Sequence, residues 1–258
     1  MDAADAGERL PVLTEDAPAR GSWRAASSPL ALRDVRAGYG RIEVLHGIDI
    51  TLGRGELVAL LGPNGAGKTT TLGVMSGLIR PNSGCFHVQG RHVNGTSAEA
   101  LARAGVCHVR EGRSVFPNLS VADNLLLLPA GADHGRVVEV AFTLFPVLKE
   151  RRQQLAGTLS GGEKQMLSLA CGLGTDPTVL LIDELSMGLA PLIVGQLYEA
   201  VAEVASAGVT TLVVEQFATL GLQFASRAYV MAHGVVTYAG PSDAASDAIQ
   251  AAYLGTPT

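Results

Sequence analysis

The chain has 258 residues, of which 47% are hydrophobic and 17% charged, and its formal net charge is −5. This length suits one large α/β domain or two small ones, and this composition indicates a substantial buried core. An acidic balance without a run of five basic residues argues against a nucleic acid as the main partner.

The cysteines and histidines favour neither disulfides nor a metal site. Cys85, Cys107 and Cys171 stand apart without a CxxC pair, and the six histidines show no metal-binding spacing. This pattern fits a reducing cytoplasm. No stretch reaches the roughly 18–20 apolar residues that span a bilayer. A role in a membrane process would therefore be exerted from one side, through partners.

The first 29 residues are rich in Ala, Asp, Pro and Ser. They lack the basic start and apolar centre of a signal peptide. We expect a disordered tail over 1–29 in preference to a structured arm, with Trp23 as its one side chain suited to docking. From residue 30 to residue 258 we expect a single folded domain.

Strand and helix patterns alternate after residue 30. Short, continuous apolar runs predict strands buried on both faces at 57–62, 104–109, 178–183 and 209–215. Helical periodicity marks the segments 69–78, 99–105, 163–173 and 191–206. This alternation predicts a parallel sheet covered by helices.

Three further segments depart from this alternation. Residues 43–52 alternate between apolar and polar, which predicts an antiparallel strand. Residues 117–158 show helical patterns without a convincing strand, and Ser120 with Asp123 forms a helix-capping pattern. We therefore expect a helical subdomain, about 112–160, inserted in the core. The sequence AHGVV at 232–236 predicts a tight turn between two late strands.

The strongest motif is GPNGAGKTT at 62–70, which follows a predicted strand and precedes a predicted helix. It fits the pattern G-x-x-x-x-G-K-[ST], and a chance glycine turn would not supply this context. The glycines let backbone NH groups surround phosphates, the lysine reaches the β/γ oxygens, and the threonine hydroxyl suits Mg²⁺. We predict nucleoside triphosphate binding by Gly62, Pro63, Asn64, Gly65, Ala66, Gly67, Lys68, Thr69 and Thr70.

Two carboxylates follow the apolar strand that ends in LLIDE. In a phosphate-loop fold, Asp183 at the strand end is placed to hold Mg²⁺. Glu184 beside it is placed to orient the attacking water or accept its proton. A solvated turn is the alternative for two such residues. The fold, however, needs an acidic strand end, and no other predicted strand supplies one.

A second glycine loop stands at LSGGEKQ, residues 159–165. Ser160 and Glu163 form a capping pattern, while Gly161 and Gly162 leave backbone NH groups accessible at a helix N-terminus, which is a natural anion site. A helix cap alone explains the serine and the glutamate but not the double glycine.

In this order and spacing, GPNGAGKTT, LSGGEKQ and LLIDE resemble the ATP-binding cassette (ABC) ATPases over about residues 30–255. The resemblance implies an α/β phosphate-loop (RecA-like) parallel sheet with an N-terminal antiparallel β subdomain and an inserted helical subdomain. It also implies that two cassettes pair head to tail, so that the loop 160–163 acts on the partner's ATP.

The resemblance assigns roles to further positions. Tyr39 matches the aromatic residue that stacks on adenine, with a buried structural tyrosine as the alternative. Glu111 stands where many relatives have a glutamine that links Mg²⁺ and water to the membrane subunit, which makes it a candidate metal ligand. Gln216 stands where a switch histidine is usual. His233 is not expected to replace that histidine, because it lies in the predicted turn.

The stretches EGR, SMGLAP and VEQ and the ending Ala252–Gly255 are similar to one ATPase subunit of the branched-chain (hydrophobic) amino acid importers. Arg110 and Leu185 depart from that subfamily, where proline is usual. The urea or short-amide importers share VEQ but usually lack SMGLAP. A soluble ABC protein that acts on ribosomes or DNA would normally carry two cassettes or a long coiled-coil insertion, and this chain has neither. A regulatory subunit without turnover would be expected to lack Lys68 or Glu184, and both are present.

The resemblance thus implies an ATPase with ATP and Mg²⁺ as cofactors, peripheral on the cytoplasmic face of the membrane. Its implied partners are a second, non-identical cassette (or a second copy), two transmembrane permease subunits and, indirectly, an extracytoplasmic substrate-binding protein. The resemblance implies that the binding protein and the permease subunits, and not this chain, select the transported molecule.

Overall fold

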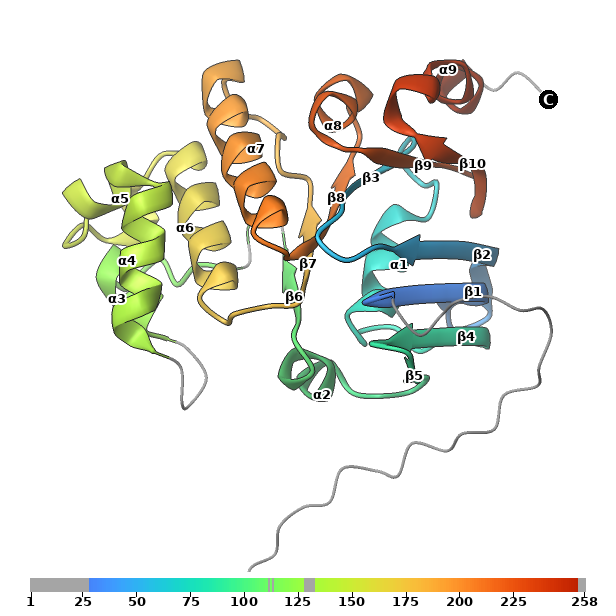
Figure 1. Cartoon of the computed structure of the whole chain (residues 1–258), viewed down its shortest axis with the longest axis horizontal. Helices are drawn as coiled ribbons and strands as arrows, with labels where there is room; N and C mark the ends of the chain where they lie inside the picture. The colour runs from blue at the N-terminus through green and yellow to red at the C-terminus, as the bar shows by residue number, and fades with distance from the viewer. Residues whose placement is uncertain (1–27, 111, 113, 128–132, 255–258) are drawn as a thin grey trace, which may run out of the picture.

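A computed structural model describes residues 28–110, 112, 114–127 and 133–254. Apart from Ser28 and Pro29, the tail expected over 1–29 lies outside these residues, and so does Glu111. The described residues form a parallel sheet with helices on one face, and helices and a smaller sheet on the other (Figure 1).

The larger sheet has six strands in the order β10-β9-β3-β8-β7-β6. All neighbours are parallel except β10, which pairs antiparallel with β9. The four apolar runs of the sequence are confirmed as β3, β6, β7 and β8. The strands are β3 (Leu57–Leu61), β6 (Val106–Val109), β7 (Val179–Asp183), β8 (Thr210–Glu215), β9 (Arg227–Ala232) and β10 (Val235–Pro241).

The smaller sheet is antiparallel, with the order β2-β1-β4-β5. The strand predicted at 43–52 is confirmed, because it falls within β2 and pairs antiparallel with β1. The fold class expected from the sequence is therefore confirmed. The strands are β1 (Leu30–Tyr39), β2 (Ile42–Leu52), β4 (Ser83–Val88) and β5 (Arg91–His92).

Four helices correspond to the predicted ones, namely α1 (Lys68–Met75), α2 (Ala98–Arg103), α6 (Gly161–Leu173) and α7 (Pro191–Ser206). Two late helices were not predicted, α8 (Ala218–Phe224) and α9 (Ser246–Leu254). Short 3₁₀ turns occupy Ala156–Thr158 and Ser242–Ala244. Within the part of the chain that the structure describes, no helix combines the length and apolar composition that a bilayer crossing requires.

The described part of 112–160 holds three short helices, α3 (Val121–Leu126), α4 (His134–Leu144) and α5 (Pro146–Glu150). The cap predicted at the start of α3 is present, because the Ser120 hydroxyl accepts a hydrogen bond of 3.0 Å from the Asp123 backbone NH. In Figure 1 these helices lie together beside α6, away from the antiparallel sheet.

Two hydrophobic cores lie on opposite faces of the parallel sheet. Along β3, Leu57, Ala59 and Leu61 belong to the core shared with α6, α7 and the α3–α5 helices, while Val58 and Leu60 belong to the other. That second core also takes in α1, α2 and the antiparallel sheet. Successive strand residues point to opposite faces, so a strand between two cores is apolar throughout.

The strand register brings three loops to one edge of the parallel sheet. Leu61 at the end of β3 pairs with Glu215 at the end of β8, and Asp183 at the end of β7 pairs with Val214. The chain segments beginning at Gly62, Glu184 and Gln216 therefore leave the sheet side by side. In open α/β sheets, ligands bind at this carboxyl edge.

The opposite edge is fastened by an ion pair. Arg227, the first residue of β9, donates through Nε and Nη2 to the two oxygens of Glu56, with both distances 2.7 Å. It also donates to the Thr51 carbonyl and, at 3.1 Å, to the Tyr229 hydroxyl. The pair therefore connects β9, the start of β3 and the end of β2.

We predict that Arg227→Lys will lower the free energy of unfolding by about 1–2 kcal/mol, because an ammonium cannot reproduce the two-pronged contact. The change is measured as a shift of the urea midpoint. Arg103→Lys is the matched control, since its pair with Glu99 is exposed and should contribute less than about 0.5 kcal/mol. Equal shifts in the two variants would contradict the prediction.

Candidate functional site

The loop 62–70 has two positions that only glycine fits. Gly62 has φ 154°, and a Cβ there would lie 2.3 Å from the Met231 carbonyl oxygen. Gly67 has φ 104°, and a Cβ there would lie 2.8 Å from Cδ2 of Leu45. Both conformations are ones that residues with side chains rarely adopt. The backbone of the loop is thus fitted closely against β9 and β2.

A turn of the late hairpin supports the loop from behind. The Gly234 NH donates to the Ala66 carbonyl at 3.0 Å, and the Gly234 carbonyl accepts from the His46 NH of β2 at 2.9 Å. His233 beside it is exposed, with φ 48°, in the turn between β9 and β10. The turn predicted there, with a solvated histidine, is confirmed.

The loop forms a cradle that fits phosphate. Helix α1 begins directly after Gly67, with no side chain capping its N-terminus and no acidic residue in its first turn. A Cβ added at Gly65 would meet nothing within 4 Å, so the loop there is open. The first NH groups of a helix have no partner within it, and the helix dipole favours an anion beside them. The backbone of Lys68, Thr69 and Thr70 offers these groups.

Lys68 is anchored within the loop. Its side chain is buried, and Nζ donates to the carbonyls of Gly62 at 2.7 Å and Pro63 at 3.0 Å. Burial lowers the pKa of Lys68, while the carboxylates of Glu184 and Asp183 oppose that shift. The structure therefore brings the lysine of the first motif and the two acids of the strand end into electrostatic contact.

Glu184 stands at a sharp bend of the chain. Its φ is 47°, which is uncommon for a residue with a side chain, and its NH donates to the Val214 carbonyl of β8 at 3.0 Å. Both Asp183 and Glu184 are half-buried. A bend held in an unfavoured conformation is typical of functional sites, and this one differs from the freely solvated turn considered as the alternative.

Sequence reasoning missed Glu215, the acid that ends β8. It is 1% exposed, and its carboxylate accepts hydrogen bonds from the Ser186 NH, the Ser186 hydroxyl and the Tyr198 hydroxyl. Burial raises its pKa, and the hydrogen bonds from Ser186 and Tyr198 oppose that shift. The one available signal was a charged residue closing the otherwise uncharged run VTTLVVE.

Gln216 follows Glu215 and is partly exposed. Its backbone carbonyl accepts a hydrogen bond from the Tyr253 hydroxyl of α9. Burial raises the pKa of Tyr253, and a hydrogen bond from the Gly62 backbone opposes that shift. Tyr253 therefore connects α9 to the loop that follows β8. From the sequence alone, Ala252–Gly255 is a feature similar to relatives, and no contact is predicted for it.

The loop 160–163 caps α6 as predicted. The Ser160 hydroxyl accepts from the Glu163 NH at 3.3 Å, and the Ser160 NH donates to the Glu163 carboxylate at 2.8 Å. Arg151 lies 2.8 Å from the same carboxylate. Packing also requires Gly162, since a Cβ there would lie 2.5 Å from Cγ2 of Ile193. Gly161 is exposed, so packing does not account for it in the same way.

The two glycine loops belong to different layers. Leu72 of α1 lies in the core on the side of the antiparallel sheet, whereas Leu167 of α6 lies in the core on the opposite face. The helices that follow the two loops are well separated in Figure 1. This separation suits two loops that act on different nucleotides.

Two further residues, Tyr39 and Glu111, have roles that only the resemblance implies. Tyr39 at the end of β1 is 55% exposed, so the alternative of a buried structural tyrosine is wrong. Glu111 lies outside the described residues, and its role stays a prediction.

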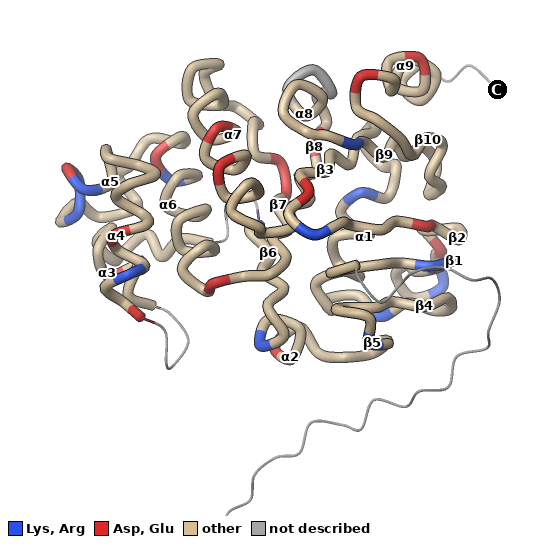
Figure 2. The backbone as a smooth tube through the Cα atoms, in the orientation of Figure 1, with Lys and Arg blue, Asp and Glu red and all other residues tan. Residues whose placement is uncertain are grey.

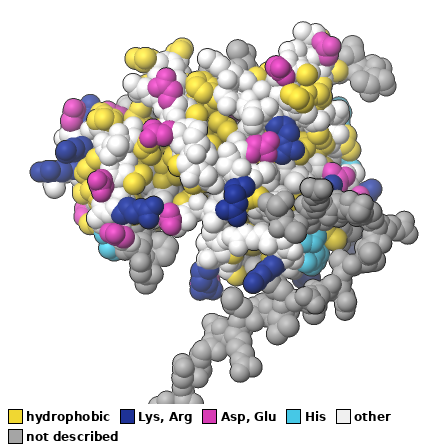
Figure 3. All heavy atoms as spheres, in the orientation of Figure 1, with side chains coloured by type: hydrophobic (Ala, Val, Ile, Leu, Met, Phe, Trp, Pro, Cys, Tyr) yellow, Lys and Arg dark blue, Asp and Glu magenta, His cyan; other side chains and the backbone are white. Residues whose placement is uncertain are grey.

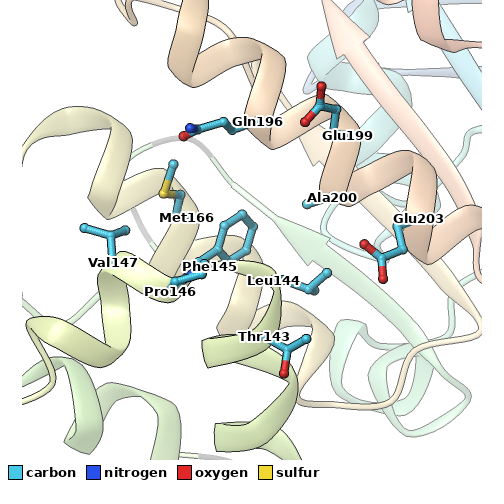
Figure 4. A pocket seen from close by; sticks show the side chains of 10 residues that line it. All are labelled: Thr143, Leu144, Phe145, Pro146, Val147, Met166, Gln196, Glu199, Ala200 and Glu203. Carbon is cyan, nitrogen blue, oxygen red and sulfur yellow. The ribbon is translucent and has the colours of Figure 1, made fainter.

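Away from this edge, the surface of the described residues is hollowed between helices. A groove of about 420 Å³ lies between the end of α4, the start of α5, α6 and α7, with Phe145, Met166 and Glu203 among its lining residues (Figure 4). Hydrophobic side chains show on the surface over these helices in Figure 3. None of the lining residues belongs to the loops 62–70 or 160–163, so this groove is separate from the phosphate cradle. Basic and acidic positions are interspersed along the part of the chain that the structure describes (Figure 2).

Comparison with known proteins places these features in a family. The family model described as "ABC transporter" matches residues 45–186. The chain is 38% identical to the high-affinity branched-chain amino acid transport ATP-binding protein BraG of Pseudomonas aeruginosa, covering 88% of this chain and 99% of that protein. It is 30% identical to a probable branched-chain amino acid transport ATP-binding protein, LivF, of Archaeoglobus fulgidus, covering 82% and 92%.

Another relative and two solved structures extend the comparison. The lipopolysaccharide export ATP-binding protein LptB of Acidithiobacillus ferridurans is 31% identical, covering 89% of this chain and 98% of that protein. A nucleotide-free ATP-binding cassette superposes with TM-score 0.77 at 23% identity over 89% of this chain and 96% of that one. A cassette in its ADP conformation gives 0.76 at 22% over 89% and 99%. Matches of this extent show that the chain belongs to the ATP-binding proteins of ABC transporters and is an ATPase.

Proposed function

We propose that this chain drives an importer for branched-chain or other hydrophobic amino acids. The observation that carries the proposal is the 38% identity with BraG over 99% of that protein's length. The similarity to LivF and the local sequences SMGLAP and VEQ support it.

Two other transport functions are the alternatives. A urea or short-amide importer is the first alternative, because it would share VEQ. An exporter is the second alternative, and the 31% identity with LptB over 98% of that protein supports it. A regulatory ABC ATPase without transport is the third alternative, and it would leave the chain with nucleotide turnover but no cargo.

We infer that the working unit contains two cassettes and two transmembrane permease subunits, with this chain peripheral on the cytoplasmic face. The second cassette is a non-identical subunit or a second copy, and a substrate-binding protein acts from outside. We further infer a helical subdomain over about 112–160, inserted in the domain 30–258. Its exposed Phe116 and Leu155 offer an apolar surface to a permease helix.

The test is ATP-driven uptake by the purified transporter complex in lipid vesicles. Accumulation of leucine, isoleucine or valine, with no accumulation of urea, supports the proposal. Uptake of urea alone would favour the short-amide importer, and extraction of lipopolysaccharide from the vesicles would favour an exporter. ATP hydrolysis with no cargo moved in any assay would favour the regulatory ATPase.

Within the site, each residue has a proposed part in hydrolysis. Residues 62–70 hold the phosphates and Tyr39 stacks on the adenine, while Lys68 offsets charge that grows on the β/γ bridge. Thr69 and Asp183 fit Mg²⁺, with Glu111 as a further candidate ligand, and the ion would neutralise phosphate oxygens. Glu184 orients the attacking water or takes its proton.

The remaining contacts come from Gln216 and from the partner. The Gln216 amide has NH donors for the γ-phosphate and a carbonyl acceptor for the water. Ser160, Gly161, Gly162 and Glu163 of each cassette close over the nucleotide of the other. Two chains then enclose two ATP molecules.

We predict that Glu184→Gln will bind ATP normally but hydrolyse it about 10²-fold or more slowly, because the amide keeps the size and loses the basicity. Turnover and nucleotide affinity are measured on the same preparation. Size-exclusion chromatography with ATP should show more cassette pairing than the wild type. Glu203→Gln is the control, because it makes the same change at an exposed position on α7. Unchanged turnover in Glu184→Gln would mean that another group positions the water.

We predict that Gln216→Ala will slow hydrolysis about ten-fold or more, given the usual 1–3 kcal/mol for an unmade polar contact. Gln216→His should preserve or raise the rate, and it should add a pH dependence near neutrality that the wild type lacks. The rate is measured in a pair whose other cassette carries the lysine-to-alanine change. Gln223→Ala, exposed on α8, is the control. An alanine variant as fast as the wild type would remove Gln216 from the site.

A further inference from the structure

The buried Glu215 carboxylate joins three elements that meet behind the site. It ends β8, it accepts 3.1 Å and 2.8 Å hydrogen bonds from the NH and hydroxyl of Ser186, and it accepts a 3.0 Å bond from Tyr198 on α7. All three residues are buried, with 1%, 8% and 1% of their surfaces exposed. Hydrogen bonds to a charged acceptor in such surroundings are short and strong.

This network holds the backbone at and just after Glu184. The Glu184 NH donates to the Val214 carbonyl, and Ser186, two residues further on, donates twice to Glu215. Consecutive residues of β8 therefore hold the chain on both sides of Glu184. The bend between them has φ 47° at Glu184, a conformation that persists only where neighbouring contacts impose it.

The loop that Glu215 holds is exposed just beyond Ser186. Ser186 opens the loop 186–190, and the next residue, Met187, is 53% exposed. Gln216 directly follows Glu215 in the chain. A displacement of the loop would therefore disturb the hydrogen bonds of the Glu215 carboxylate. This carboxylate interacts electrostatically with Glu184 and directly precedes Gln216 in the chain.

We propose that Glu215 is a positioning residue that fastens the loop 186–190 to the end of β8 and so holds Glu184 in line for hydrolysis. Glu215 acts through hydrogen bonds and takes no part in proton transfer. This role rests on the proposed function of Glu184 and Gln216 in the site.

The two hydroxyl groups on Glu215 provide a matched test. Ser186→Ala removes the hydroxyl attached to the loop, while Tyr198→Phe removes the one attached to α7 and keeps the ring stacked on Phe224 at 5.0 Å. Each variant leaves the same carboxylate with one donor fewer. Both should therefore lower the melting temperature similarly, by about 2–4 °C.

Their effects on turnover should differ. In the purified transporter complex, Ser186→Ala should lower kcat about ten-fold with the KM for ATP within about two-fold, since one charge-assisted contact to the loop is lost. Tyr198→Phe should keep kcat within about two-fold. Equal kcat values in the two variants would overturn the proposal, because the contact would then serve stability alone.

Changes at Glu215 itself separate positioning from chemistry. In Glu215→Gln the amide oxygen can accept from the Ser186 NH and Tyr198, and the amide NH₂ can donate to the Ser186 hydroxyl. It should therefore retain most of the turnover that Glu215→Ala loses. If Glu215→Gln were as slow as Glu215→Ala while remaining folded, the negative charge would be acting directly on the reaction and the positioning role would be wrong.

The wild-type complex distinguishes this inference from the transport proposal. ATP hydrolysis without amino acid uptake would overturn the importer and leave the role of Glu215 standing. Uptake with equal kcat in Ser186→Ala and Tyr198→Phe would overturn the role of Glu215 alone.

Discussion

The parallel pairing of β8 with β3 on one side and β7 on the other is the constraint on which the site depends. All six residues of β8 are buried, and its register fixes Leu61 opposite Glu215 and Asp183 opposite Val214. The carboxyl ends of parallel strands lie at the same edge of the sheet. This ladder therefore places the phosphate loop, Glu184 and Gln216 side by side. A slip of one residue would exchange the faces of a strand lying between two cores, so packing protects the register.

Backbone supports then fix the loops more closely than the ladder can. Gly62 and Gly67 admit no Cβ against Met231 and Leu45, and the turn at Gly234 links the phosphate loop to β2. The antiparallel sheet therefore contributes to the site, although it packs on one face of the parallel sheet and not at its carboxyl edge. Rigid support of this kind keeps the donors in place before a ligand arrives, which is how a preorganised site stabilises a charged transition state.

The sequence predicted the features that depend on neighbouring residues. Continuous apolar runs marked β3, β6, β7 and β8, and the Ser160–Glu163 pattern marked the start of α6, since both signals are local. The helices α8 and α9 were missed because their apolar faces pack on a core assembled from distant parts of the chain. The Glu215 network was missed for the same reason, as its donors lie 29 and 17 residues away. The roles of the individual site residues stay predictions.

The contact between Tyr253 and Gln216 has a practical consequence for handling the protein. Tyr253 lies in α9, the last helix in the described part of the chain. A bulky fusion placed close behind Tyr253 in the chain would disturb the helix whose hydroxyl contacts Gln216, the residue proposed to bind the γ-phosphate. Rates measured with such a fusion would report the tag as well as the enzyme. A small dye placed there would instead turn the same proximity into an optical signal for nucleotide turnover.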